Sequence, residues 1–388
     1  MDRRRFLTSS TVAAASGLLG AAAAGSVPAR ASAPAPPIDP QRIDFRMDGL
    51  GLRPHEYVAL LHDVVGDDGF EADGYSNGGA VARLEQVFAD RLGKEAAVFL
   101  PTGTLANHLA VRTLAGNDRR VLVQAESHLY NDSGDGATEL SGLNLVPLAS
   151  GAATIPLGEL QAWVERSRSG RVRTPVGVLS IENPVRRRDH EMVDPGELER
   201  VCGYAREQGI RLHLDGARMF HLPHHSGRSV REYAALFDTV YVSLWKHFNA
   251  ASGAILAGDA RTLEGLYHAR RMFGGSLPYA WPSMAVAARF VDGYEAAYAR
   301  SWAAADALIQ RLQADGRFAV RKPPNGTSRF FLSVPVNSAQ AFVERLRARG
   351  ILLARMAPGA SEIPMQVNPG ILGMPPEQLA GLFAAALD

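Results

Sequence analysis

The sequence contains little that would place it outside the ordinary globular proteins. Its single cysteine, Cys202, excludes an intrachain disulfide, so packing must stabilise the fold. Neither sign of charge is in excess: 41 Lys and Arg against 40 Asp and Glu give a net charge of +1, which offers no electrostatic case for a nucleic-acid partner. The 38 glycines and 23 prolines among 388 residues stay far below a low-complexity composition, and no internal repeat is visible.

The N-terminal segment has the pattern of an export tag. Arg3, Arg4 and Arg5 precede an uncharged stretch that is rich in small residues, and small-x-small cleavage sites follow at residues 29–33. RRRFL resembles a twin-arginine signal, which predicts that residues 1–33 are removed and that the mature protein is periplasmic or secreted, without stable membrane insertion. An uncleaved N-terminal anchor is the alternative.

The rest of the chain reads as an α/β protein. From about residue 55, helical periodicity alternates with short apolar runs, a pattern typical of a parallel sheet flanked by helices. The chain turns helical over about residues 283–312, and residues 330–356 read as strand, helix and strand. We therefore expect a large doubly wound, mostly parallel domain with an N-terminal arm over residues 34–280, and a small α+β domain over residues 281–388. The apolar runs fall at residues 96–100, 176–180, 211–215, 239–244 and 253–257.

Three features at predicted strand ends could carry chemistry. Gly103 and Thr104 open a helix after a strand, so their free N–H groups could hold an anion such as phosphate, although a capped turn that binds nothing is the simpler interpretation of this motif alone. Asp215 ends another strand and could bind a protonated pyridine nitrogen. Arg218, three residues later, could donate hydrogen bonds to an oxyanion or carboxylate. The alternative is that Asp215 caps the next helix and Arg218 lies on the surface. Lys246 follows a third strand and could act as an amine nucleophile, although a lone lysine at a strand end is usually solvated.

The histidines and an arginine run are less specific. His128 could stack on a flat cofactor ring or exchange protons near neutral pH. The cluster of His221, His224 and His225 lacks the helical i, i+4 spacing of a zinc pair, so we predict no metal site. The run 186–188 of three arginines is most simply a solvated loop, and it could also line a cleft for an acidic substrate.

Four motifs together resemble one enzyme family. PTGTLAN at 101–107, ESHLY at 126–130, HLDGAR at 213–218 and the later Lys246 have the order and spacing of the threonine aldolase/β-eliminating lyase group. These are fold-type I enzymes that use pyridoxal 5′-phosphate (PLP). The resemblance covers about residues 40–388 and implies a transferase-like fold with a large PLP-binding domain. It also implies a homodimer or homotetramer with active sites at the subunit interface.

The resemblance also implies a role for each matching residue. Lys246 would bond covalently to the cofactor aldehyde, Asp215 would bind the pyridinium nitrogen, and His128 would stack on the ring. Arg218 would lie near the cofactor oxygen and the substrate carboxylate. The phosphate contacts would come from Gly103, Thr104 and Ser243.

This chain departs from the family pattern mainly on the substrate side. Met47 stands where the family has a serine, Arg186 falls in a segment that the family fills with Thr-His-Asn, and Trp245 replaces a serine before the lysine. The small-domain arginine of the family aligns with Met365. Either another side chain then binds the substrate carboxylate, or the substrate is not a standard amino acid. The candidate groups are Arg218, Arg329, Arg355 and the run 186–188.

We therefore expect a PLP-dependent carbon–carbon lyase of the threonine aldolase type, which splits Cα–Cβ of a β-hydroxy-α-amino acid into glycine and an aldehyde. His128 is the candidate base for the β-hydroxyl proton. One alternative keeps PLP but changes the reaction to β-elimination, racemisation or transamination. Another is an exported PLP-binding protein without turnover.

Overall fold

The computed structural model describes residues 39, 42–66, 69–335, 339–356, 360 and 362–387. All of them belong to one contact unit, Pro36–Asp388. The predicted signal segment 1–33 lies outside the described residues.

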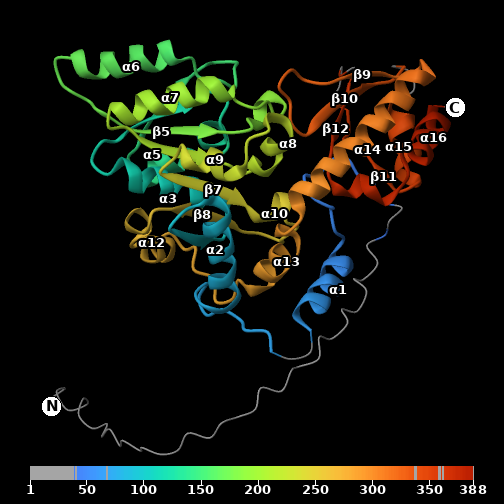
Figure 1. The fold of residues 1–388 in the computed structure, drawn as a ribbon, viewed down its shortest axis with the longest axis horizontal. Helices are drawn as coiled ribbons and strands as arrows, with labels where there is room; N and C mark the ends of the chain where they lie inside the picture. The colour runs from blue at the N-terminus through green and yellow to red at the C-terminus, as the bar shows by residue number, and fades with distance from the viewer. Residues whose placement is uncertain are drawn as a thin grey trace, which may run out of the picture. The chain divides into compact units, whose positions relative to one another are not determined.

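A seven-stranded sheet forms the centre of the fold, in the order β2-β8-β7-β6-β5-β3-β4. Figure 1 labels its strands β5, β7 and β8. The β3, β4, β5, β6 and β7 strands run parallel to their neighbours within this set, whereas β8 is antiparallel to both β7 and β2. This confirms the predicted doubly wound, mostly parallel sheet. The strands are β2 Ala96–Leu100, β3 Arg120–Gln124, β4 Asn144–Leu148, β5 Val176–Glu182, β6 Arg211–Asp215, β7 Thr239–Ser243 and β8 Ala254–Gly258.

Helices cover both faces of the sheet, which explains why its strands are apolar throughout rather than alternating. On β7, Val240 and Val242 pack into the larger core cluster, which also holds apolar residues of α2, α6 and α7. Tyr241, between them, packs into a second cluster with residues of α3 and α12, because successive side chains on a strand point to opposite faces. The helices are α2 Gly79–Leu92, α3 Gly103–Ala115, α6 Leu157–Ser169, α7 Pro195–Glu207 and α12 Leu266–Met272.

Short helical segments connect the strands. The predicted start of α7 is confirmed, since the Asp194 carboxylate accepts the Glu197 N–H at 2.7 Å and Pro195 occupies the first turn. The connecting segments are α4 His128–Asn131, α5 Gly136–Ser141, η1 Arg186–Arg188, η2 Met219–His221, α8 Leu222–Ser226, α9 Val230–Ala235, α10 Leu244–His247 and α11 Ala260–Leu263.

The predicted helical stretch 283–312 is interrupted. It consists of α13 Trp281–Val291 and α14 Tyr294–Asp315, and Gly293 between them has a φ of +80°, a left-handed conformation that glycine adopts without strain. The predicted domain boundary near residue 280 stays a prediction.

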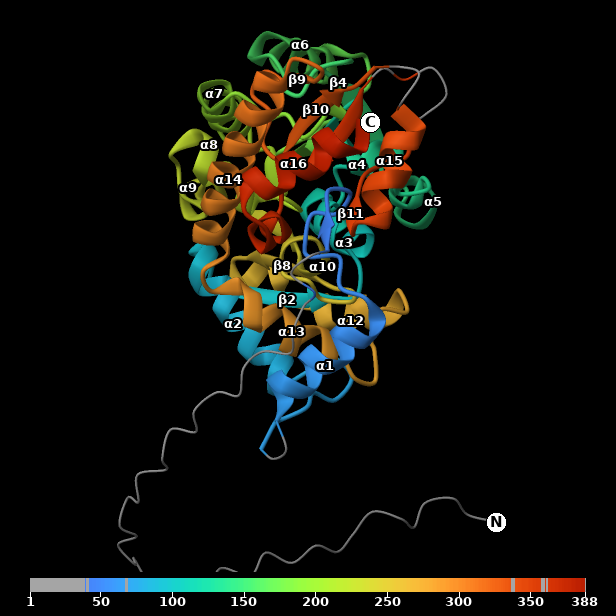
Figure 2. The same cartoon turned by 90° about the vertical axis from the view of Figure 1, so that its right-hand side faces the viewer.

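A small antiparallel sheet follows, in the order β12-β10-β9, with helices packed against it (Figure 2). This agrees with the predicted C-terminal α+β unit. Its elements are β9 Ala319–Arg321, β10 Arg329–Ser333, α15 Ala339–Ala348, β12 Ile363–Gln366, η4 Pro369–Gly373 and α16 Pro376–Leu387. The strand expected over 351–356 is shorter, β11 Ile351–Leu352, and it pairs in parallel with β1 Ile43–Asp44 of the N-terminal arm rather than with the small sheet.

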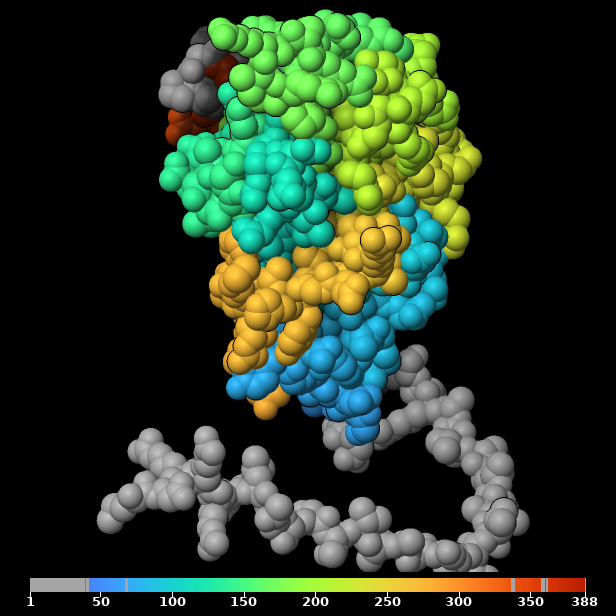
Figure 3. All heavy atoms as spheres, turned by 90° about the vertical axis from the view of Figure 1, so that its left-hand side faces the viewer, coloured from blue at the N-terminus to red at the C-terminus, as the bar shows by residue number. Residues whose placement is uncertain are grey.

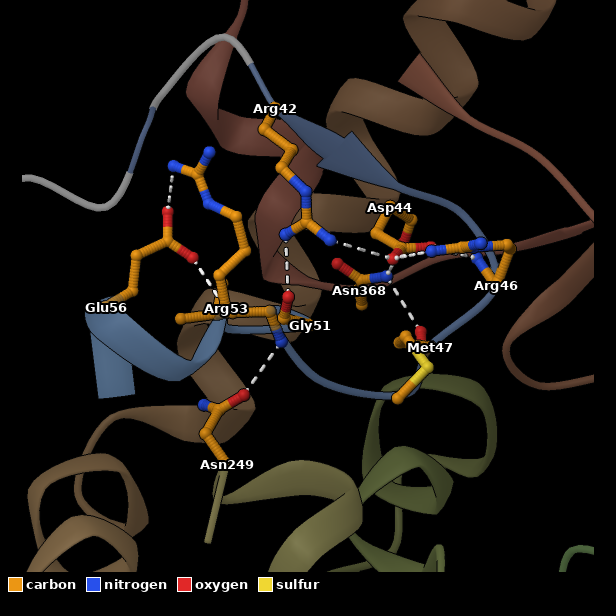
Figure 4. Close-up of polar contacts among 10 residues, drawn as sticks. Arg42, Asp44, Arg46, Met47, Gly51, Arg53, Glu56, Asn249 and Asn368 are labelled. Atoms are coloured by element: carbon orange, nitrogen blue, oxygen red, sulfur yellow. Dashed lines mark hydrogen bonds and ion pairs between the residues drawn. The ribbon is translucent and has the colours of Figure 1, made fainter. Parts of the chain in front are cut away.

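The N-terminal arm makes hydrogen bonds with residues beyond β12 and beyond α10 (Figure 4). The Asn368 side chain, which follows β12, donates to the Asp44 and Met47 carbonyl oxygens at 2.8 Å. On the other side, the Asn249 side chain accepts the Leu50 N–H at 2.7 Å, just beyond α10. The arm then enters α1, Pro54–Val65. Residues 44–50 therefore lie between the small sheet and the end of α10.

Among the described helices, none combines the length and apolar character needed to cross a membrane.

A buried aspartate anchors the segment before α2 to the start of α13. Asp73 accepts the Ser76 N–H at 2.9 Å and the N–H groups of Ala280 and Trp281 at 2.8 and 2.7 Å. Tyr75 N–H also donates to the Pro278 carbonyl at 2.9 Å. Figure 3 shows the chain around α12, in orange, directly against the blue N-terminal part.

Replacing Asp73 with Ala should lower the free energy of unfolding by about 3 kcal/mol, because three N–H groups, two of them buried, lose their acceptor. Urea unfolding measures the change. Glu71→Ala, which breaks only the exposed ion pair with Arg83, is the control and should cost less than about 1 kcal/mol. An equal effect of both substitutions would contradict the anchoring role of Asp73.

Candidate active site

A cavity of about 210 Å³ opens at the carboxyl ends of the parallel strands, the edge where open α/β sheets bind ligands. All residues to which the family resemblance gives a role line it except Ser243, and of the further carboxylate candidates only Arg186 does. Its lining consists of Thr102, Gly103, Thr104, His128, Glu182, Arg186, Asp215, Ala217, Arg218, Tyr241, Trp245, Lys246 and Ser252.

The first turn of α3 forms one wall of the cavity. The Thr102 hydroxyl caps the helix by accepting the Leu105 N–H at 3.2 Å, which leaves the N–H groups at Gly103 and Thr104 beside the cavity. A Cβ at position 103 would collide with the Tyr241 hydroxyl, so the site requires glycine there. A helix N-terminus of this kind suits a phosphate.

Asp215 is held by a chain of buried side chains. Its Oδ2 accepts from Asn107 Nδ2 at 2.5 Å, and Asn107 Oδ1 lies 2.9 Å from His213 Nε2. His213 Nδ1 in turn lies 2.9 Å from the Thr239 hydroxyl. Because the Asn107 oxygen can only accept, His213 must carry its proton on Nε2. Burial lowers the pKa of His213 to about 4, so the ring is neutral and this order of donors holds at neutral pH.

Lys246 lies in α10, directly after β7, and is buried beside the cavity. Burial and, to a smaller extent, the Arg218 cation lower the pKa of Lys246 to about 8, against the opposing effect of the Asp215 carboxylate. The Lys246 ammonium also lies 5.6 Å from the Trp245 ring. A large fraction of this amine is therefore unprotonated at mildly alkaline pH, as a nucleophile requires.

Arg218 is held by a carboxylate that the sequence analysis did not single out. Its Nε and Nη2 each donate to Asp48 at 2.8 Å, and both side chains are buried. Burial alone would raise the pKa of Asp48, but Arg218 holds it well below the usual range. Gln366 Nε2 donates to the same carboxylate at 3.1 Å.

Glu182 ends β5 beside Asp215 and fixes two neighbours. Its Oε2 accepts the His128 N–H at 2.6 Å, and its Oε1 accepts the Arg186 N–H at 2.9 Å. Burial and the adjacent Asp215 carboxylate raise the pKa of Glu182 to about 7. Glu182 thus sets the backbone positions of His128 and Arg186 around the cavity.

His128 begins α4 at the wall of the cavity. Burial lowers the pKa of His128, so its ring is neutral at physiological pH. Among the described residues, none makes a hydrogen bond with its buried Nδ1. The ring thus carries an unsatisfied nitrogen in a residue that lines the cavity.

Several positions differ from the sequence-based picture. Ser243 is fully buried at the end of β7 and does not line the cavity, so its phosphate contact stays a prediction. Met365 is buried in the core, and it is Gln366, the next residue on β12, that reaches Asp48. Because neighbours on a strand face opposite ways, only one of these two side chains is directed at Asp48, and the alignment of the missing arginine with Met365 stays a prediction. Trp245 and Arg186 both line the cavity.

The histidine cluster has a packing role. His221 is buried, stacks on Tyr298 with ring centroids 4.2 Å apart, and bonds to the Tyr294 hydroxyl at 3.0 Å. His225 bonds to the Tyr298 hydroxyl at 3.1 Å. Within the part of the chain that the structure describes, no group of three or more His, Cys, Asp or Glu residues is arranged to hold a metal ion.

The donor set fits pyridoxal phosphate. The α3 N-terminus suits its phosphate, Asp215 suits a protonated pyridine nitrogen, Lys246 suits its aldehyde, and His128, which has an unpaired ring nitrogen, lines the same cavity. Four unlike groups, each matched to a different part of one molecule, make a fold-type I PLP site the class that this geometry defines.

Comparison with known proteins identifies the family. A family model for the β-eliminating lyases matches residues 62–371, and the chain belongs to this family. Membership confirms the predicted resemblance, the PLP cofactor and the class of PLP-dependent lyases.

Individual relatives carry different names. A low-specificity L-threonine aldolase from Saccharomyces cerevisiae is 31% identical over 50% of this chain and 50% of its own length. The alanine racemase TOXG from Cochliobolus carbonum is 30% identical over 61% of this chain and 59% of its own. The chain thus spans about half to three fifths of these relatives. A crystal structure from Listeria monocytogenes, whose name proposes an L-allo-threonine aldolase, is 28% identical with a TM-score of 0.72 and covers 87% of this chain and 94% of that one.

Lys246 in the cofactor-free protein should react with a neutral acylating reagent at a rate that rises with pH and reaches half its maximum near pH 8, because only the unprotonated amine attacks. Mass spectrometry of the Lys246 peptide follows the reaction. Arg218→Gln removes the neighbouring cation and should move this midpoint to higher pH. A midpoint that stays fixed in this variant would contradict the role of Arg218.

Proposed function

We propose that this protein cleaves the Cα–Cβ bond of a β-hydroxy-α-amino acid and releases glycine and an aldehyde. One observation carries the proposal: a neutral histidine with an unpaired ring nitrogen and a lysine of lowered pKa line the same small cavity as Asp215. The threonine aldolase names among the relatives support it.

The residues divide the reaction between them. His128 Nδ1 takes the proton of the β-hydroxyl, the C–O bond becomes a carbonyl, and the Cα–Cβ bond breaks with its electron pair left on Cα. Bound pyridoxal phosphate supplies the electron sink that delocalises this pair. Asp215 would hold the pyridine nitrogen of the cofactor in its protonated form, and Lys246 Nζ delivers to Cα the proton that completes glycine.

Racemisation is the second candidate, because the relative TOXG is named an alanine racemase. It requires proton removal and return at Cα, and no bond to Cβ breaks. Loss of optical activity from L-alanine without aldehyde release would favour this reaction. β-Elimination or transamination would instead yield a keto acid.

We also propose that the chain assembles as a homodimer or homotetramer and that its N-terminal segment directs twin-arginine export. The family resemblance supports the first proposal and the RRRFL pattern supports the second.

The PLP-loaded protein that starts at residue 34 should release aldehyde from at least one member of a panel of β-hydroxy amino acids, and a coupled alcohol dehydrogenase assay would detect it. Lys246→Ala should abolish release, since the amine that bonds the cofactor is lost. Absence of aldehyde from every member, in protein shown spectroscopically to hold PLP, would overturn the proposed cleavage.

His128→Phe keeps the ring and the backbone N–H that Glu182 holds, but removes the nitrogen base. We expect the cleavage rate to fall by about 10²- to 10⁴-fold while glycine still binds with similar affinity. Stopped-flow kinetics and spectral titration separate these quantities. His224→Phe, outside the cavity, is the control. An equal loss in glycine binding would assign His128 to binding rather than proton transfer.

A further inference from the structure

The cavity must hold the negative charge of an amino-acid substrate, and Arg218 is poorly placed to do so alone. Two of its donor groups, Nε and Nη2, already bond to both oxygens of Asp48. The pair is buried and nearly neutral as a unit, so a carboxylate that approaches it meets little net positive charge. A two-pronged arginine–carboxylate contact with the substrate is therefore not available on that edge of Arg218.

The small sheet does not supply the missing charge either. Gln366 is neutral and is engaged with Asp48 and with Arg329, whose Nε donates to Gln366 Oε1 at 3.2 Å. Arg329 also faces Asp189 at 3.6 Å and is not among the residues that line the cavity. Arg355 lies at a different pocket, beside Arg347 and Leu353.

Arg186 is the remaining arginine in the cavity wall. Its backbone N–H is fixed by Glu182, and within the described chain only Nη2 of its guanidinium has a hydrogen-bond partner, the Asp132 carboxylate. The Nε and Nη1 groups remain for a ligand. Arg186 is thus held in place at its backbone and at the far end of its side chain.

The local charge also favours an anion at this point. Asp132 is shared by Arg186 and Arg187, whose Nη2 donates to it at 2.8 Å. The hydrogen bonds from these arginines lower the pKa of Asp132 to about 2, so the carboxylate stays charged. Two guanidinium groups against one carboxylate give these three side chains a net charge of +1, so Asp132 alone does not neutralise both arginines.

From these contacts we propose that Arg186 binds the α-carboxylate of the substrate, in place of an arginine from the small sheet. The inference rests on the proposed amino-acid substrate and makes the loop after β5 the carboxylate-binding element. Glu182 then holds both ends of the substrate site, since the same carboxyl fixes the backbone of His128.

The test compares two ligands that differ in the carboxylate. Glycine and glycinamide have the same amine and nearly the same size, and only glycine carries the negative charge. Binding of each to the PLP-loaded protein is measured by spectral titration in the wild type, Arg186→Gln, Arg186→Lys, Arg187→Gln and Arg329→Gln. Arg187 is the matched control, because it bonds to the same Asp132 but does not line the cavity.

Arg186→Gln should weaken glycine binding about 10- to 100-fold and leave glycinamide binding within about threefold, since one charge-assisted contact is lost. Arg186→Lys should recover part of the loss because it restores the charge without the planar donor pair. Arg187→Gln should change neither ligand by more than about threefold. For a cleaved substrate, Arg186→Gln should raise KM more than it lowers kcat.

The inference is overturned if Arg186→Gln weakens both ligands equally, or if only Arg329→Gln shows the carboxylate-specific loss. It is also overturned, together with the proposed amino-acid substrate, if the wild type binds no amino acid although it holds PLP. If glycine binding follows the expected pattern but no aldehyde appears, the proposed cleavage fails and the assignment of Arg186 stands.

Discussion

The buried ion pair between Asp48 and Arg218 is the interaction on which the arrangement of this site depends. Burying two charges is expensive, and a pair of this kind is tolerated only when its geometry is good and its remaining atoms are satisfied. Here two parallel N–H···O contacts of 2.8 Å and a third from Gln366 meet that condition. The pair therefore links the N-terminal arm, the end of β6 and the small sheet.

The same pair shapes the chemistry of the lysine. Arg218 keeps its positive charge beside Lys246 and helps lower the pKa of the amine, while Asp48 and Asp215 prevent the shift from becoming larger. An arginine without Asp48 would repel the protonated lysine more strongly and would also compete for the substrate carboxylate. The arm thus influences the pKa of a residue far along the chain through the charge of Asp48.

The sequence predicts much of this architecture because the patterns that mark strands and helix ends depend on residues close together in the chain. The apolar runs and the punctuation of α7 depend on near neighbours, and parallel strands necessarily bring their ends to one edge. Gly103, Asp215 and Lys246 were predictable for that reason. Asn107 belongs to the PTGTLAN motif and Glu182 follows the predicted strand 176–180, but their roles depend on partners 108 and 54 residues away, Asp215 and His128, which periodicity does not reveal. The role of Gln366 depended on which face of β12 it occupies, and a shift of one residue reverses that face.

Glu182 couples substrate binding to proton transfer, because it positions the residues proposed for both. A carboxyl with one oxygen on the His128 N–H and the other on the Arg186 N–H sets the distance between the two backbone positions. If Arg186 receives the substrate carboxylate and His128 receives the β-hydroxyl proton, the spacing between these two substrate groups is matched by a single rigid side chain. Gln124 reinforces that rigidity, because its amide bonds to both the N–H and the carbonyl of Glu182, at 2.6 and 3.1 Å. The site then selects substrates by the distance between Cα and the β-oxygen. Substrate atoms beyond Cβ would lie near the exposed Trp245, which also lines the cavity.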